Sequence, residues 1–130
     1  MALNILIVDD SQIVRAVIVK SIELANVPVA QLHQASNGLE ALGILVRHPV
    51  DLVFADINMP IMNGVQMIER MNGDERLKHI PIVIVSTEGS TTRVEELMTH
   101  GVRAYLRKPF RPENIREVVE QIIEVDHANR

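Results

Sequence analysis

The stretch DLVFADINMPIMNG, residues 51–64, joins an apolar run to a polar loop at a single carboxylate. Its first half, Leu52–Ala55, is a short apolar run typical of a strand buried on both faces. The run stops at Asp56. Signals of a loop and of a helix start follow it: Asn58, Met59-Pro60 and Asn63-Gly64. Asp56 therefore either begins a turn or belongs to a site completed by groups from elsewhere in the chain.

Length and composition indicate one globular domain. A chain of 130 residues is large enough to bury about two thirds of its unfolded surface. With 47% hydrophobic and 23% charged residues, the composition is that of a folded protein rather than a disordered one. Aromatic residues are scarce, so the core must be aliphatic; they are Phe54, Tyr105 and Phe110.

Several classes of function are disfavoured by what the sequence lacks. No apolar run approaches the roughly 20 residues of a transmembrane helix, and the N-terminus has no basic flank of a signal peptide. There is no cysteine, and the net charge of −4 argues against nucleic acid as a partner. No glycine-rich phosphate loop is present. We therefore expect a cytoplasmic protein that binds neither nucleic acid nor membrane.

Five apolar runs alternate with five segments of helical periodicity. The predicted strands are residues 3–8, 30–35, 51–55, 81–85 and 102–106, and the second, being more polar, is expected near a sheet edge. The predicted helices are residues 12–25, 37–48, 64–72, 92–101 and 112–125. The predicted helix caps are Ser11, Asn37 with Glu40, Asn63, and Thr92 with Glu95. This alternation predicts an α/β fold in which helices cover both faces of a parallel sheet.

Polar residues follow four of the five predicted strands: Asp9-Asp10, Asp56, Ser86 and Lys108. Taken singly, each has an ordinary structural interpretation. An acidic pair suits a helix N-terminus, a serine or an aspartate suits a turn, and a lysine before proline suits a solvated loop. In open parallel sheets, however, functional groups gather at the carboxyl ends of the strands. The coincidence at four strand ends favours a shared site.

The chemistry of these residues points to phosphoryl transfer. Three neighbouring carboxylates repel one another unless a cation is present, and Mg²⁺ prefers such oxygen ligands. Lys108 adds a positive charge and Ser86 a hydroxyl donor, which together suit a phosphoryl group. Asp56 can act as the nucleophile and form an aspartyl phosphate. The five histidines show no ligand spacing and are expected at the surface.

These residues give the chain a close resemblance to the receiver domains of two-component response regulators, specifically the stand-alone CheY-like kind. The motifs that carry it are Asp9-Asp10, Asp56 to Pro60 with Asn63-Gly64, Ser86, Tyr105 and Lys108-Pro109-Phe110. The resemblance implies the flavodoxin-like fold, a doubly wound five-stranded parallel sheet of order 2-1-3-4-5, for which CheY is a standard example. It also implies a single receiver domain over residues 1–130, without an output domain.

The resemblance assigns roles to the polar residues. Mg²⁺, for which Mn²⁺ or Ca²⁺ can substitute, would be bound by Asp10, Asp56 and the backbone carbonyl of Asn58, with Asp9 nearby or acting through water. Asp56 would take a phosphoryl group from the phosphohistidine of a sensor histidine kinase. Lys108 and Ser86 would hold the phosphoryl oxygens. The Lys108-Pro109 peptide bond is expected to be cis.

The resemblance also implies a switch and a set of lifetime modulators. The phosphoryl dianion would draw Ser86 inward and let Tyr105 rotate, remodelling the surface formed by residues 92–101, 102–106 and 112–125. Asn58 and Glu88 occupy the positions that modulate the lifetime of the phosphoryl group and are similar to the short-lived chemotaxis type. Thr87 is bulkier than the alanine or glycine common in the family, so we expect it to hinder access of the phosphodonor or of water to the site.

Four candidate functions can be compared with these residues. The first is a diffusible, monomeric chemotaxis-type regulator whose remodelled surface binds a target such as the flagellar motor switch. The second is a phosphorelay intermediate or phosphate sink that passes the group to a histidine phosphotransfer protein. A flavin- or nucleotide-binding enzyme is disfavoured because Asp9-Asp10 would repel phosphate. An aspartate-nucleophile phosphatase is disfavoured because Asn58 cannot transfer protons. We therefore expect no enzyme activity beyond the domain's own phosphorylation and dephosphorylation.

Overall fold

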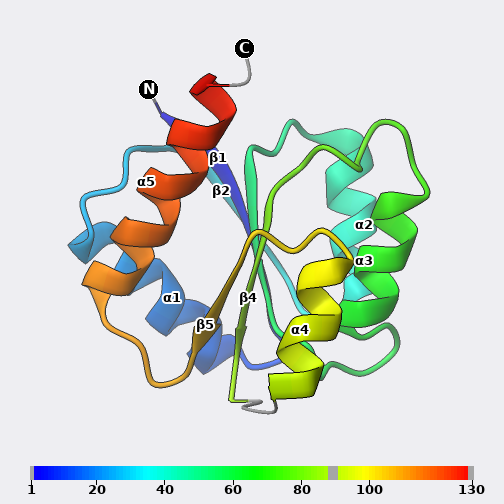
Figure 1. The fold of residues 1–130 in the computed structure, drawn as a ribbon. Coiled ribbons are helices and arrows are strands. Elements are labelled where there is room, and N and C mark those ends of the chain that lie inside the picture. The colour runs from blue at the N-terminus through cyan, green and yellow to red at the C-terminus, as the bar shows by residue number, and fades with distance from the viewer. Residues whose placement is uncertain (1, 88–90, 129–130) are drawn as a thin grey trace.

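A computed structural model describes residues 2–87 and 91–128 and contains ten alternating strands and helices within them (Figure 1). The strands are β1 (Leu3–Val8), β2 (Val29–Ala35), β3 (Leu52–Ala55), β4 (Ile82–Ser86) and β5 (Ala104–Arg107). The helices are α1 (Gln12–Leu24), α2 (Gly38–Arg47), α3 (Gly64–Asn72), α4 (Thr91–Thr99) and α5 (Pro112–Ala128). The predicted alternation is confirmed.

The five strands form one parallel sheet in the order β2-β1-β3-β4-β5, as expected for the flavodoxin-like fold. Helices α1 and α5 cover one face, and α2, α3 and α4 cover the other (Figure 1). The polar strand β2 lies at the sheet edge, as its sequence predicts. The strand order changes direction between β1 and β3, so the carboxyl ends of these two strands mark the topological switch point.

The core follows the two-residue period of the strands, because successive side chains point to opposite faces. Residues Val53 and Ala55 of β3 pack toward α2, α3 and α4. Their neighbours Leu52 and Phe54 pack toward α1 and α5. The strands must be apolar on both faces for this arrangement, which explains their continuous hydrophobic runs.

Three of the predicted N-caps are confirmed by their hydrogen bonds. The side chains of Ser11, Asn37 and Asn63 each accept a hydrogen bond from a backbone N–H in the first turn of α1, α2 and α3, respectively. Gln66 completes a capping box with Asn63. These caps fix the helix starts immediately after the loops that follow β1, β2 and β3.

The start of α4 and the start of β5 differ from their predictions. Thr92 lies inside α4, which begins at Thr91, so Thr92 is not the N-cap. β5 begins at Ala104 rather than at residue 102 because Val102 still belongs to the helix end. The Val102 N–H donates to the Leu97 carbonyl, and Gly101 has a φ of +92°. This is the left-handed conformation that commonly closes a helix.

The prediction that all the histidines lie at the surface is wrong for His33. This residue of β2 is half-buried and its ring stacks on that of His48, with ring centroids 4.7 Å apart. The stacking partner comes from the end of α2, and a pattern of sequence spacing cannot anticipate such a contact. His127 lies in α5, and its side chain falls outside the described residues.

Two glycines let the loop after β3 pack tightly. A Cβ atom on Gly64 would lie 2.4 Å from the Asp56 carbonyl oxygen, and the Gly64 N–H donates to the Ile57 carbonyl. A Cβ atom on Gly38 would lie 2.9 Å from the Met62 carbonyl oxygen, to which the Gly38 N–H donates. The loop is thus held between the first turns of α2 and α3.

Among the described residues, no helix has both the length and the apolar character needed to cross a membrane.

Candidate functional site

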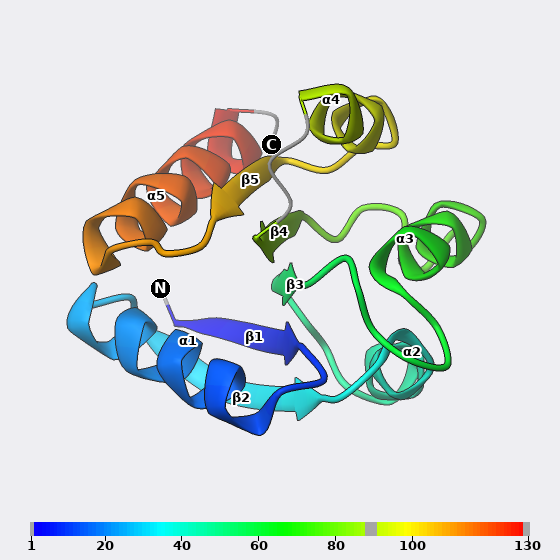
Figure 2. The same ribbon diagram turned by 90° about the horizontal axis from the view of Figure 1, so that it is seen from below.

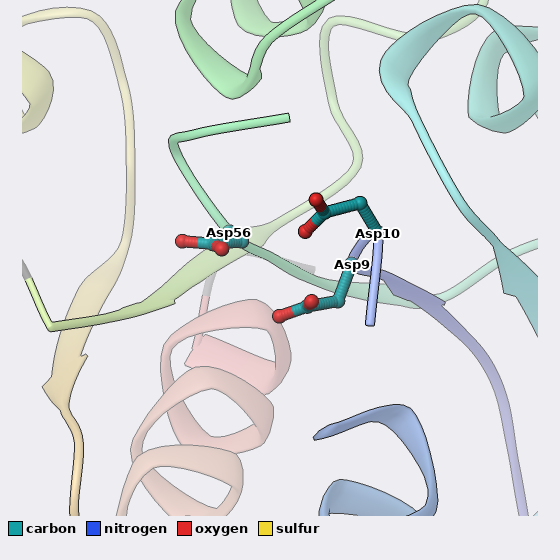
Figure 3. A group of neighbouring side chains, drawn as sticks. All are labelled: Asp9, Asp10 and Asp56. Carbon is teal, nitrogen blue, oxygen red and sulfur yellow. The ribbon is translucent and has the colours of Figure 1, made fainter. Parts of the chain in front are cut away.

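The carboxyl ends of the paired strands β1 and β3 lie side by side (Figure 2), and three carboxylates come together there (Figure 3). Asp9 and Asp10 follow β1, and Asp56 follows β3. The Asp56 N–H donates to the Val8 carbonyl at 3.0 Å, which aligns the ends of the two strands. Each aspartate offers an oxygen within 4.8 Å of those of the other two. In Figure 3 the side chains of Asp9 and Asp10 extend toward the side on which Asp56 lies.

The three carboxylates differ in their surroundings. Asp9 is buried, with 2% of its surface exposed, and its Oδ1 accepts a hydrogen bond from the Ser11 N–H at 2.9 Å. Asp56 is largely buried, and its Oδ1 accepts from the Ile57 N–H at 2.7 Å. Asp10 is exposed. The site is therefore closed to solvent at Asp9, partly accessible at Asp56 and open to solvent at Asp10.

Lys108 supplies the cation that the sequence predicts for this edge of the sheet. Its Nζ atom donates to Asp9 Oδ2 at 3.2 Å and lies 3.9 Å from Asp56 Oδ2. The Lys108 N–H donates to the Ser86 carbonyl at 2.9 Å, which ties the end of β5 to the end of β4. The Lys108-Pro109 peptide bond is cis, as expected from the resemblance. One ammonium group thus faces two of the three carboxylates.

The donor set fits a hard divalent cation. Three carboxylates outnumber the single ammonium of Lys108, and the excess negative charge lies on closely spaced oxygen atoms. Mg²⁺, Mn²⁺ and Ca²⁺ all prefer oxygen ligands of this type. Asp10 and Asp56 are the more accessible carboxylates and would hold the ion, while Asp9 is already paired with Lys108.

The remaining predicted residues differ in burial and in their place in the sheet. Ser86 is buried at the end of β4, on the strand next to Asp56. Asn58 and Thr87 are exposed, and Tyr105 is half-buried in β5 on the side that packs toward α4. Glu88 lies outside the described residues.

Arg15 contacts the site and is not among the residues predicted from the sequence. The guanidinium Nη1 donates to the Asp9 backbone carbonyl at 2.5 Å, and Nε donates to Gln34 Oε1 at 3.0 Å. A helical side chain leans toward the helix N-terminus. An arginine in the second turn of α1 can therefore reach back over the loop that precedes the helix, and this spacing is the signal that would have identified it.

Comparison with known proteins identifies the family. The family model of the response regulator receiver domain matches residues 5–120. The chain belongs to the response regulator receiver family. Two curated relatives of this receiver domain are chemotaxis proteins, CheY-3 of Vibrio cholerae and CheY of Pseudomonas aeruginosa. Each is 34% identical over 122 residues; the alignments cover 94% of this chain and 92% and 97% of those proteins, respectively.

Solved structures of receiver domains share the fold. The chemotaxis protein CheY4 of Vibrio cholerae has a TM-score of 0.82 at 27% identity, covering 94% of this chain and 99% of that one. The receiver domain of a sensor histidine kinase from Pseudomonas aeruginosa also has a TM-score of 0.82, at 19% identity, covering 95% of this chain and 99% of that one. The latter structure has a magnesium ion coordinated in its active-site cleft.

The crowding of carboxylates leads to a prediction about stability. In the absence of divalent cations, Asp10→Asn is expected to raise the melting temperature by about 2–5 °C, because it removes a negative charge close to Asp9 and Asp56. Saturating Mg²⁺ should stabilise the wild-type domain more than the variant and so reduce or reverse the difference. Thermal unfolding with EDTA and with Mg²⁺ measures both effects.

Asp74→Asn is the matched control for this prediction. Asp74 is not part of the carboxylate cluster, and hydrogen bonds from the Arg76 side chain and backbone hold the pKa of Asp74 below its usual value. The folded state therefore favours the Asp74 carboxylate, and its replacement should not raise the melting temperature. An equal rise in both variants would contradict repulsion within the cluster.

Proposed function

We propose that this receiver domain accepts a phosphoryl group on Asp56 from the phosphohistidine of a sensor histidine kinase, with Mg²⁺ bound by Asp10 and Asp56. We further propose that it acts as a diffusible chemotaxis-type regulator. The observation that carries the proposal is the convergence of three carboxylates and Lys108 at the switch point of the sheet. The domain would have no enzyme activity beyond its own phosphorylation and dephosphorylation.

The geometry supplies what an acceptor carboxylate needs. The Ile57 N–H holds one Asp56 oxygen, which leaves Oδ2, on the side of Lys108, to attack the phosphorus atom. As the new oxygen–phosphorus bond forms, the bond to the donor nitrogen breaks, and the histidine leaves with its electron pair. Lys108 neutralises charge on the phosphoryl oxygens from one side, and the Ser86 hydroxyl would donate a hydrogen bond. The bound cation would supply further charge neutralisation from the side of Asp10.

The signal would leave the site through β4 and β5. Ser86 ends β4, and Tyr105 lies in β5 paired in register with Ile84, two residues before Ser86. A hydroxyl drawn toward the phosphoryl dianion would leave space for the Tyr105 ring to rotate and remodel the α4–β5–α5 surface. Unchanged Tyr105 rotamers after binding of a phosphoryl mimic such as beryllofluoride would contradict this coupling.

The choice of pathway rests on the relatives. The curated proteins to which this domain is similar are chemotaxis regulators, which supports a chemotaxis-type role. A phosphorelay or phosphate-sink role would instead require Asp56 to donate to a histidine phosphotransfer protein. Mixing the phosphorylated domain with the host's motor switch protein and with its phosphotransfer proteins distinguishes these roles by binding in one case and phosphoryl loss in the other.

The metal requirement gives the direct test. Adding EDTA to the protein with a small phosphodonor, such as phosphoramidate, should slow phosphorylation of Asp56 by about 100-fold or more, because the developing charge loses a main stabilising group. Excess Mg²⁺ or Mn²⁺ should restore the rate. Mass spectrometry of the intact protein measures incorporation. Equal rates with and without EDTA would contradict the proposed role of the cation.

A further inference from the structure

Arg15 lies at the junction of three segments behind the acidic pair. It belongs to α1, is half-buried, and its backbone N–H donates to Ser11 in the first hydrogen bonds of that helix. Its guanidinium joins the Asp9 carbonyl, in the loop after β1, to the Gln34 side chain of β2. The planar guanidinium presents several donors in a fixed arrangement, so it can hold both acceptors in one geometry.

The two members of the acidic pair are anchored differently. Every polar group of Asp9 has a partner: the N–H donates to Ala35, the carbonyl accepts from Arg15, and the carboxylate accepts from Ser11 and Lys108. In the part of the chain that the structure describes, no hydrogen bond holds the carboxylate of Asp10. The direction of Asp10 therefore depends on the peptide group that joins it to Asp9. Arg15 binds the oxygen of that peptide group.

We infer that Arg15 is a positioning residue, which orients the Asp9–Asp10 peptide group and so holds the Asp10 carboxylate where it can share a divalent cation with Asp56. The inference rests on the proposed function, because it takes Asp10 as a ligand of Mg²⁺. Arg15 does not touch the reacting atoms. Its contribution is the geometry of the carboxylates before a cation binds, which sets how much reorganisation cation binding requires.

Charge alone would give Arg15 the opposite effect. A positive charge next to the acidic pair repels a divalent cation, so its removal should tighten Mg²⁺ binding if electrostatics dominated. Glu40 reduces this repulsion from the α2 side. Hydrogen bonds from Ser36 are the main cause that lowers the pKa of Glu40, and the charge of Arg15 adds to the effect. Positioning and charge therefore predict changes of opposite sign.

The test is the Mg²⁺ affinity of the unphosphorylated protein, measured from amide chemical shifts in an NMR titration. Arg15→Ala is expected to weaken binding by about 10-fold, the size typical of residues that orient metal ligands. Arg15→Lys should also weaken it, because an ammonium group cannot reproduce the two directed hydrogen bonds. Arg47→Ala is the matched control, since Arg47 also donates from Nε to a backbone carbonyl, that of Gly43, at an exposed position of α2.

The possible outcomes separate the inference from the proposed function. Wild-type or tighter Mg²⁺ binding by Arg15→Ala, with normal binding by the wild type, would overturn the positioning role alone. Failure of the wild type to bind Mg²⁺ would overturn the proposed function as well. If Arg15→Ala does not fold, Gln34→Ala tests the inference instead, because Gln34 is exposed and accepts a hydrogen bond only from the Nε atom of the guanidinium. It should show a smaller weakening, and unchanged affinity would overturn the inference.

Discussion

Asp56→Asn is expected to abolish phosphorylation of this domain. The asparagine amide has nearly the shape of the carboxylate, and its oxygen can still accept the hydrogen bond from the Ile57 N–H. It lacks the anionic oxygen that attacks phosphorus, however, and a neutral amide is a poor nucleophile. Incubation with phosphoramidate and Mg²⁺, followed by mass spectrometry of the intact protein, should show one phosphoryl group on the wild type and none on the variant.

Asp51→Asn provides the control for this experiment. Asp51 immediately precedes β3, at the end of the strand away from Asp56, where its carboxylate accepts a hydrogen bond from the Asn4 N–H at 2.8 Å. The variant therefore carries the same chemical change near the same strand but outside the site. It should be phosphorylated at the wild-type rate. Full incorporation in Asp56→Asn, mapped to another residue, would show that Asp56 is not the acceptor.

Gly64→Ala is expected to lower the free energy of unfolding by about 2–4 kcal/mol and to impair phosphorylation as well. The added Cβ atom would lie 2.4 Å from the Asp56 carbonyl oxygen and 3.0 Å from the Ile57 Cα atom. Both are backbone atoms, so no side-chain rotation can relieve the overlap. Either α3 or the acceptor segment must move, and a shift of the Asp56 backbone misplaces its carboxylate.

Gly43→Ala separates this local effect from a general response to glycine replacement. Gly43 lies within α2, and a Cβ atom there would be 3.5 Å from the nearest atom outside the helix backbone, the Nη2 of the flexible Arg47 side chain. This variant should be more stable than the wild type by roughly 0.5–1 kcal/mol, the helix preference of alanine over glycine. Urea unfolding of both variants gives the comparison. Similar stability of Gly64→Ala and wild type would mean that the close approach is readily relieved.

Much of the fold could be predicted because its signals are local. The continuous apolar run at Leu52–Ala55 indicates a strand covered on both faces, and Ser11 and Asn63 mark helix starts through bonds within one turn. The start of β5 was less predictable, because Val102 has the side chain of a strand residue and the backbone hydrogen bond of a helix end. The half-buried His33 stacks on His48, a contact between separate elements that local sequence signals do not reveal.

For the site, the sequence predicts which residues come together but not the distances between them. The parallel arrangement explains why Asp9, Asp56 and Lys108 lie at one edge, since each follows the carboxyl end of a strand. The sequence does not reveal that Lys108 Nζ lies nearer to Asp9 than to Asp56, at 3.2 Å against 3.9 Å. Nor does it reveal the contact of Arg15 with the Asp9 carbonyl. Such distances depend on packing between elements far apart in the chain.

The first residues of β1 and the last turn of α5 lie at the end of the sheet opposite to Asp56 (Figure 1). A fluorescent reporter, an affinity handle or a sensor surface attached beyond either element would therefore stand away from the acidic edge. The tether would then lie at the end of the sheet opposite to the carboxylates. Surface-based measurements of kinase recognition are accordingly best made with the domain immobilised through one of its ends rather than through randomly coupled lysines, one of which is Lys108.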